Sequence, residues 1–203
     1  MKLRLKLHKA VAKAAEAVAR GGVVVYPTET VYGIGCRVFD AEAVERVKTI
    51  KRREEKPSPV LVSDFDQLDE VARPNEHEVE ACYRLWPGPV TIIMEKAPQL
   101  PPVVTAGKPT VGVRMPANAV ALTLIQKSNT PLLGTSANIS GKPAATSLGL
   151  VEPEIIKLVD CVVDGGRTLY GKPSTVIELV DGEVRVVREG AWSLEEIRSR
   201  LES

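Results

Sequence analysis

The sequence predicts a single α/β domain spanning residues 1–203, in which helices flank one mixed β-sheet. Two observations support this prediction. Short apolar runs typical of buried strands alternate along the chain with segments whose apolar residues recur at helical spacing. The dipeptide Asp181-Gly182 separates two strand-like segments and indicates an antiparallel hairpin, whereas strands separated by helices can be parallel. No repeat, low-complexity segment or linker interrupts the pattern.

The individual elements follow from the same signals and from their end residues. Gly21-Gly22 ends the first helical pattern as a C-cap would, and Asp40 is suited to N-cap the second helix. Ser193 and Glu196 have the spacing of a capping box for the last helix. Strands are expected at 23–26, 60–62, 90–94, 110–114, 132–134, 161–163, 175–179 and 184–188. Helices are expected at 7–18, 44–50, 67–72, 79–86, 117–127, 155–159 and 194–201.

The composition excludes several classes of protein. A formal net charge of +1 argues against a uniformly basic surface for nucleic acid, so any polyanion site must be local. The cysteines Cys36, Cys82 and Cys161 form no CxxC pair, and this predicts neither a disulfide framework nor a zinc site. His8 and His77 lie in polar helical settings typical of surface histidines. No signal peptide or membrane span is evident, and we expect a cytoplasmic protein.

One stretch combines a strand end with many polar groups: Tyr26-Pro27-Thr28-Glu29-Thr30-Val31-Tyr32-Gly33-Ile34-Gly35-Cys36. A hydroxyl-rich, glycine-punctuated turn after a strand is where an α/β protein places a ligand site. The alternative is a hairpin or loop whose glycines adopt positive φ. Composition leaves both interpretations open, and it assigns no role to Glu29.

A run of cations follows the second predicted helix: Lys48, Lys51, Arg52, Arg53 and Lys56. Basic side chains at a helix C-terminus complement the helix dipole, so a solvated helix end is one interpretation. A clamp for a polyphosphate is the other. The run alone does not decide between them.

Two nucleotide-binding motifs are excluded by their own residues. Residues 166–172 match the opening of a P-loop, but Pro173 stands where that loop needs a Ser or Thr hydroxyl. Gly33-Ile34-Gly35 lacks the third glycine of a dinucleotide fingerprint. What remains is a set of polar turns at strand ends, at 27–35, 51–56, 110–114, 135–143 and 173–175. Their hydroxyls, amide and cations suit charge stabilisation around a triphosphate better than proton transfer or covalent catalysis.

Five motifs in the same order resemble the YrdC family, the threonylcarbamoyl-adenylate synthases. They are the 26–35 stretch, Lys51-Arg52-Arg53, Trp86-Pro87-Gly88-Pro89-Val90-Thr91, Val113-Arg114-Met115-Pro116 and Thr135-Ser136-Ala137-Asn138-Ile139-Ser140-Gly141, within about residues 10–192. The resemblance implies a twisted open α/β sheet with a concave basic cavity. It also implies a nucleotidyltransferase that makes threonylcarbamoyl-AMP and pyrophosphate from L-threonine, bicarbonate and ATP, for the threonylcarbamoyladenosine modification of tRNA.

The same resemblance assigns roles to residues. It implies catalytic and ATP-binding roles for Lys51, Arg53, Ser136 and Asn138, further ATP contacts at Lys56, Thr110 and Arg188, and a threonine pocket of Thr30, Tyr32, Arg114 and Ser174. A planar, bidentate donor such as Arg114 suits a carboxylate. ATP is expected as a substrate with Mg²⁺, which its phosphates can hold without protein carboxylates. Neither a protein metal ligand nor a prosthetic group is expected.

The implied partners are ATP, L-threonine, bicarbonate and a downstream threonylcarbamoyl-transfer enzyme complex, with weak tRNA binding as an option and no membrane contact. A monomer or homodimer is expected. Because the chain ends at Ser203, we expect the cavity to close without the extra C-terminal domain of longer relatives. Two alternatives stay open. One is a non-catalytic double-stranded RNA- or tRNA-binding maturation factor of the same fold. The other is a hydrogenase-maturation carbamoyltransferase, whose acylphosphatase and zinc-finger segments are absent from this sequence.

Overall fold

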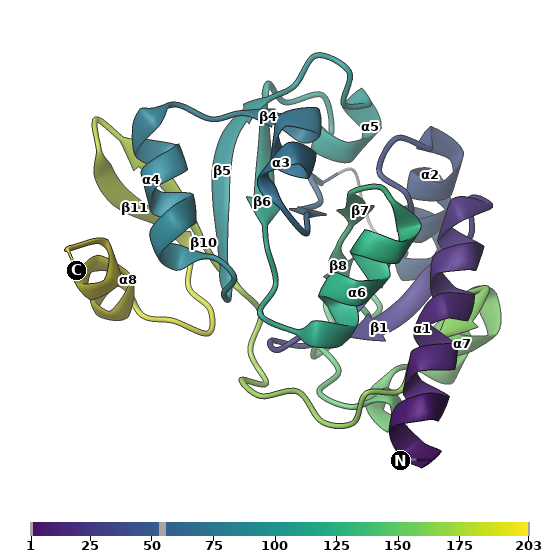
Figure 1. The fold of residues 1–203 in the computed structure, drawn as a ribbon. Coiled ribbons are helices and arrows are strands. Elements are labelled where there is room, and N and C mark those ends of the chain that lie inside the picture. Colours follow the sequence, from purple (N-terminus) through teal and green to yellow (C-terminus); the bar gives the residue numbers. More distant parts are fainter. Residues whose placement is uncertain (1, 53–55, 203) are drawn as a thin grey trace.

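The computed structural model describes the backbone of residues 2–52 and 56–202 and the side chains of residues 5–52 and 56–202. Its strands form two sheets, one of order β8-β2-β1-β9 and one of order β11-β10-β5-β6-β3-β7 in which β4 also pairs with β5 (Figure 1). The smaller sheet contains β1 (Val24–Pro27), β2 (Tyr32–Gly35), β8 (Thr135–Ser136) and β9 (Cys161–Val162). The larger contains β3 (Val60–Leu61), β4 (Ala72–Arg73), β5 (Val90–Lys96), β6 (Thr110–Arg114), β7 (Leu132–Leu133), β10 (Thr175–Val180) and β11 (Glu183–Arg188).

Helices cover both ends of this arrangement (Figure 1). At one end α1 and α6 pack together against β1 and β9, and at the other α4 packs against α8 beside β5. Between them, α2 contacts β2, α5 and α7. The helices are α1 (Lys2–Ala19), α2 (Ala41–Lys51), α3 (Phe65–Val71), α4 (Glu76–Leu85), α5 (Pro102–Thr105), α6 (Ala119–Ser128), α7 (Pro153–Leu158) and α8 (Leu194–Glu202), with a 3₁₀ turn at Leu148–Leu150.

Both sheets are mixed, as predicted. β1 pairs antiparallel with β2 and parallel with β9, and β5 pairs antiparallel with β6 and parallel with β10. The strands are divided between two sheets because the chain changes sheet at Gly134, which separates β7 from β8. A Cβ at Gly134 would lie 2.4 Å from Leu61 Cγ, so only glycine fits at this crossing point. The sequence did not predict the division.

The local signals at element ends are confirmed. Asp40 Oδ1 accepts a hydrogen bond from Ala43 N at 3.0 Å and so caps α2. Ser193 and Glu196 exchange the two hydrogen bonds of a capping box before α8. Asp181-Gly182 joins β10 to β11 with φ values of 52° and 82°, the positive values that a tight hairpin turn needs.

The motif at residues 26–36 is a β-hairpin whose polar turn lies at residues 28–31. A hairpin was one of the interpretations left open for this stretch, and it is confirmed: residues 32–35 form β2, which pairs antiparallel with β1. Neither Gly33 nor Gly35 has positive φ. A Cβ at Gly35 would lie 2.0 Å from Leu133 O, and one at Gly33 would press on the Tyr26 ring at 3.3 Å. These glycines therefore permit close packing and not an unusual backbone conformation.

The core consists of two clusters. One lies among α1, α6, β1 and β9, and the other fills the space around the larger sheet. All three cysteines are buried and unpaired, and burial raises the pKa of Cys36 and of Cys82 to about 12. The thiols of Cys36 and Cys82 are therefore neutral packing groups. Within the described ranges, no helix combines the length and apolar character needed to cross a bilayer.

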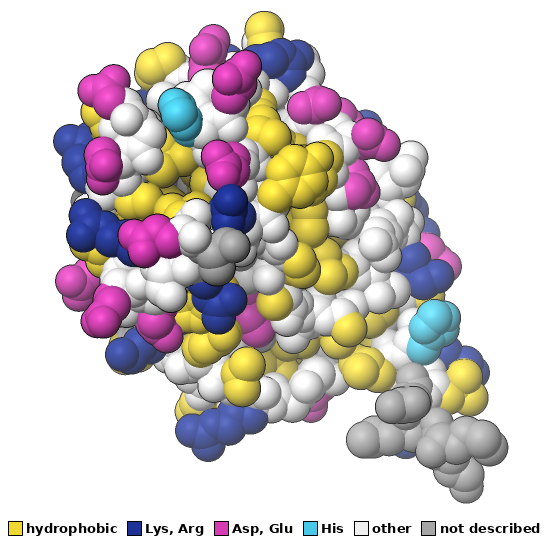
Figure 2. Space-filling view, turned by 60° about the vertical axis from the view of Figure 1, so that its left-hand side comes forward, with side chains coloured by type: hydrophobic (Ala, Val, Ile, Leu, Met, Phe, Trp, Pro, Cys, Tyr) yellow, Lys and Arg dark blue, Asp and Glu magenta, His cyan; other side chains and the backbone are white. Residues whose placement is uncertain are grey.

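Basic and acidic side chains are interspersed on the outer surface. Figure 2 shows one face, with Lys and Arg lying among Asp and Glu and with apolar side chains between them. Several of these charges form ion pairs, such as Arg52 with Glu154 and Arg84 with Glu80. On the face shown in Figure 2, positive charge is not gathered into one continuous surface.

Asp160 joins the segment before β9 to two other elements. Its Oδ2 accepts hydrogen bonds from Val23 N at 2.7 Å and from Arg46 Nη1 at 2.6 Å. Burial alone would raise the pKa of Asp160, but the Arg46 and Val23 hydrogen bonds and the Arg46 charge lower it. Because the Arg46–Asp160 pair is partly exposed, we expect Asp160→Asn to lower the free energy of unfolding by only about 1 kcal/mol at neutral pH.

The effect of Asp160→Asn should depend on pH. A carboxyl with a depressed folded-state pKa contributes stability above its unfolded-state pKa, and that contribution is lost as pH falls through the folded-state pKa. In urea titrations, the difference between native protein and variant should therefore shrink in strongly acidic buffer. A difference that stays constant from neutral to acidic pH would contradict this account of the ion pair.

Candidate active site

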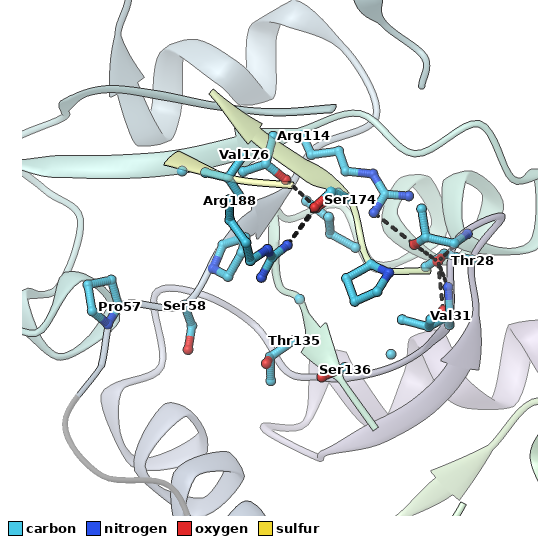
Figure 3. A pocket seen from close by; sticks show the side chains of 18 of the residues that line it. Thr28, Val31, Pro57, Ser58, Arg114, Thr135, Ser136, Ser174, Val176 and Arg188 are labelled. Carbon is cyan, nitrogen blue, oxygen red and sulfur yellow. Dashed lines mark hydrogen bonds between the residues drawn. The ribbon is translucent and has the colours of Figure 1, made fainter. Parts of the chain in front are cut away.

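A cavity of about 260 Å³ opens between the two sheets, and strands of both sheets line it. Its polar lining is Thr28, Thr30, Ser58, Thr91, Thr135, Ser136, Ser174, Arg114 and Arg188, together with Tyr26 (Figure 3). Ligand pockets commonly have volumes of about 300–1,000 Å³. The cavity therefore suits a molecule the size of an amino acid, and a nucleotide would have to extend beyond it. The described lining residues include no carboxylate or histidine.

The turn between β1 and β2 presents a chain of hydroxyl groups to this cavity. Thr28 Oγ1 donates to Val31 O at 2.7 Å and lies 2.8 Å from Thr30 Oγ1. Because a threonine has one hydroxyl proton, Thr30 must be the donor to Thr28. Thr30 Oγ1 in turn accepts from Arg114 Nη1 at 3.0 Å. The hydrogen bonds thus run in one direction, from Arg114 through Thr30 and Thr28 to Val31.

Arg114 is the last residue of β6 and is buried in the cavity wall. Its Nε donates to Gly88 O at 3.0 Å, and its Nη2 lies 2.6 Å from Glu29 Oε1 in an enclosed ion pair. A guanidinium has five N–H groups, and the hydrogen bonds to Gly88 and Thr30 use two of them. Arg114 therefore keeps donors for a planar anion such as a carboxylate.

A second guanidinium lies on the other side of Ser174 (Figure 3). Arg188 ends β11, and its Nη2 donates to Ser174 O at 2.6 Å and to Ser174 Oγ at 3.3 Å. Ser174 Oγ also lies 2.8 Å from Thr91 Oγ1, on β5. Because β10 pairs with both β5 and β11, Thr91 on β5, Ser174 just before β10 and Arg188 on β11 form one polar wall.

Lys51, the last residue of α2, is hydrogen-bonded to the turn at residues 136–140, which contains the predicted nucleotide contacts Ser136 and Asn138. Its Nζ donates to Ser136 O and to Asn138 O, the latter at 2.8 Å, and its carbonyl accepts from Ser140 N at 2.9 Å. Ser136 lines the cavity, whereas Lys51 itself does not appear in the lining. In this structure the Lys51 cation therefore acts on the backbone of the turn.

Three further residues predicted to contact ATP do not line the cavity: Thr110, Asn138 and Lys56. Thr110 lies on the same face of β6 as Gly112 and Arg114, both of which line the cavity, so Thr110 lies beyond its rim on that face. Asn138 is buried, and its Oδ1 has no hydrogen-bond partner among the described residues. Lys56 is exposed and lies next to Pro57, which lines the cavity. Arg53 lies outside the described residues.

The structure does not place Tyr32 with the other predicted threonine contacts, and this corrects the assignment made from sequence. The ring is buried, and the hydroxyl donates to Gly166 O at 2.7 Å and accepts from Gly165 N at 3.1 Å. Tyr32 is not a lining residue, because alternate residues of β2 point to opposite faces. Its hydroxyl anchors the loop around Gly165.

Sequence reasoning missed Thr28, Ser58 and Thr91 as lining residues and Glu29 as the partner of Arg114. Thr28 and Glu29 belong to the quoted motif, and the density of polar groups there was a usable signal. Ser58 carries no comparable signal, because a serine between two prolines is typical of any surface loop.

Two mixed sheets that enclose a cavity lined by hydroxyl and guanidinium groups define a class of α/β protein whose cavity suits a small anionic ligand. Residues 16–190 match the Sua5/YciO/YrdC family, whose description reads "Telomere recombination". The chain belongs to this family.

Curated relatives match most of this chain. The threonylcarbamoyl-AMP synthase of Pyrococcus abyssi is 42% identical over 186 residues, which are 91% of this chain and 55% of that protein. The putative threonylcarbamoyl-AMP synthase of Methanocaldococcus jannaschii is 36% identical over 89% of this chain and 85% of its own length. The crystal structure of P. abyssi Sua5 with L-threonine superposes with a TM-score of 0.89 at 40% identity, over 94% of this chain and 56% of that one. This chain thus spans about half the length of the P. abyssi protein.

Proposed function

We propose that this protein forms threonylcarbamoyl-AMP and pyrophosphate from L-threonine, bicarbonate and ATP, a nucleotidyl transfer that supplies tRNA modification. The observation that carries this proposal is the buried guanidinium of Arg114, which keeps unused donors at the wall of a cavity of amino-acid size. The P. abyssi relative that binds L-threonine has the same fold and supports the choice of amino acid.

In the proposed reaction, the α-carboxylate of threonine binds Arg114, with Thr30 and Ser174 beside it. The threonine amine adds to CO₂ derived from bicarbonate and loses a proton, which gives a carbamate. A carbamate oxygen then attacks the α-phosphorus of ATP, and the bond from that phosphorus to the bridging oxygen of the β-phosphate breaks, so that pyrophosphate leaves. The protein contributes position and positive charge to this step.

The nucleotide would extend from the cavity past Ser136 toward Asn138 and along the face of β6 that bears Thr110. Arg188 is the cavity-lining cation available to offset charge on the leaving pyrophosphate. ATP would enter as its Mg²⁺ complex. Within the described part of the chain no cluster of His, Cys, Asp and Glu could hold a metal ion, so the phosphates would carry Mg²⁺.

The test is pyrophosphate release with purified protein. We expect release from ATP to require both L-threonine and bicarbonate, because the carbamate is the nucleophile. Serine and glycine serve as matched amino acids that share the carboxylate and amine. Release at the same rate with either of them, or with no amino acid, would contradict the proposal. Tight tRNA binding without ATP turnover would support the RNA-binding alternative.

A further inference from the structure

Glu29 is a buried acid in contact with the cavity-lining residue Arg114. The proposed reaction assigns Glu29 no role. Glu29 lies between Thr28 and Thr30 in the β1–β2 turn, and its side chain is only 4% exposed. Its backbone carbonyl accepts from Tyr170 N at 2.9 Å, which holds the turn from outside. Glu29 does not line the cavity, so it does not reach a ligand there.

The one charged partner of Glu29 among the described residues is Arg114, whose Nη2 is 2.6 Å from Glu29 Oε1. Arg114 is thereby held at three of its nitrogens: Nε by Gly88 O, Nη1 by Thr30 Oγ1 and Nη2 by Glu29. Three contacts in different directions fix both the position and the plane of a guanidinium. The plane matters because a carboxylate binds a guanidinium in that plane, through two parallel hydrogen bonds.

We propose that Glu29 is a positioning residue that holds the Arg114 guanidinium in the orientation that receives the substrate carboxylate. This inference rests on the proposed function, because it assumes that threonine binds at Arg114. Three contacts already hold Arg114 in the structure, so the orientation would exist before threonine arrives. Binding would then lose less conformational entropy than if the side chain had to be ordered by the ligand.

A competing electrostatic argument gives the opposite sign and makes the proposal testable. If Glu29 mattered only through its charge, it would weaken the attraction between Arg114 and a carboxylate, because a negative group at 2.6 Å offsets the guanidinium. Removing that charge would then tighten threonine binding. If Glu29 holds the plane of the guanidinium, removing it weakens threonine binding although the net positive charge increases.

The experiment compares native protein with Glu29→Gln, which keeps the shape of the side chain and removes its charge. Threonine and ATP binding are each measured by calorimetry, and KM and kcat are measured by pyrophosphate release. We expect the threonine Kd and KM to rise about ten-fold, with the ATP Kd unchanged. Glu29→Asp, which keeps the charge on a shorter stem, should fall between the two. Asp160→Asn is the control for the loss of a carboxylate from an Arg ion pair, because Asp160 and its partner Arg46 do not line the cavity, and it should leave the threonine Kd unchanged.

Each outcome either supports or overturns the positioning role of Glu29. Threonine binding by folded Glu29→Gln that equals or exceeds the native affinity overturns the positioning role. If Glu29→Gln does not fold, the threonine affinity of Glu29→Asp decides whether Glu29 has a positioning role. A folded Glu29→Asp protein with native threonine affinity would make Glu29 a structural residue only. The failure of both variants to fold would lead to the same conclusion. If the native protein itself binds no threonine, the proposed function fails first, and this result is distinguishable from the others.

Discussion

Arg114→Lys is expected to lower kcat/KM for threonine by at least a hundred-fold. A lysine ammonium cannot reach Gly88 O, Thr30 Oγ1 and Glu29 together and also present two parallel donors, so it would leave buried partners unsatisfied. A buried hydrogen-bonding group that is left unsatisfied typically costs about 1–3 kcal/mol. The measurement is the rate of pyrophosphate release as a function of threonine concentration.

The matched control for Arg114→Lys is Arg46→Lys, which makes the same chemical change in a half-exposed ion pair on α2. Circular dichroism of both variants would show whether the fold is retained. A folded Arg114→Lys protein with a native threonine KM would mean that the carboxylate binds elsewhere, and the assignment of the threonine site would have to be withdrawn.

Lys51→Met is expected to reduce kcat by about a hundred-fold, the effect that a small misplacement of substrate-positioning groups can have. Methionine has similar length and volume but cannot donate to Ser136 O and Asn138 O. The two carbonyls would lose their shared cation, and the turn that carries Ser136 would keep the backbone hydrogen bond from Ser140 N to the carbonyl of residue 51 but lose its side-chain contacts with α2. Because the turn is proposed to hold the nucleotide, the ATP Kd should rise as well.

Lys48→Met is the corresponding control. Lys48 is also largely buried on α2, but its Nζ pairs with Glu45 one turn earlier and not with the nucleotide-side turn. Steady-state kinetics should therefore separate the two variants. Equal activities for Lys48→Met and Lys51→Met would show that the loss of charge on α2 matters and that the contact with the turn does not.

Features that depend on neighbouring residues could be predicted from the sequence. Local interactions within four residues of chain can be recognised without knowledge of the fold. They are the N-cap at Asp40, the Ser193–Glu196 capping box and the turn at Asp181-Gly182. The family resemblance placed Thr30, Arg114, Ser136, Ser174 and Arg188 at one site, and these residues do line one cavity.

The remaining features depend on contacts that are distant in sequence. Residues 32–35 contain two glycines, which are poor strand formers, and become β2 only because β1 and β8 pair with them. The contact of Lys51 with this turn could not be predicted because Ser136 O and Asn138 O are backbone carbonyls, which leave no residue signature. The role of Glu29 could not be predicted either, because its partner Arg114 is distant in sequence and lies on a strand of the other sheet.

The one-way order of hydrogen bonds from Arg114 to Val31 has a consequence for selectivity. The proton of Thr30 is committed to Thr28, so toward the cavity Thr30 can offer only a lone pair. A ligand that brings an amine or hydroxyl to this point is matched, whereas one that brings a carbonyl or carboxylate oxygen meets a second acceptor and is repelled. We therefore expect Thr30 to favour a hydrogen-bond donor of the ligand, beside Arg114, which favours an acceptor such as a carboxylate.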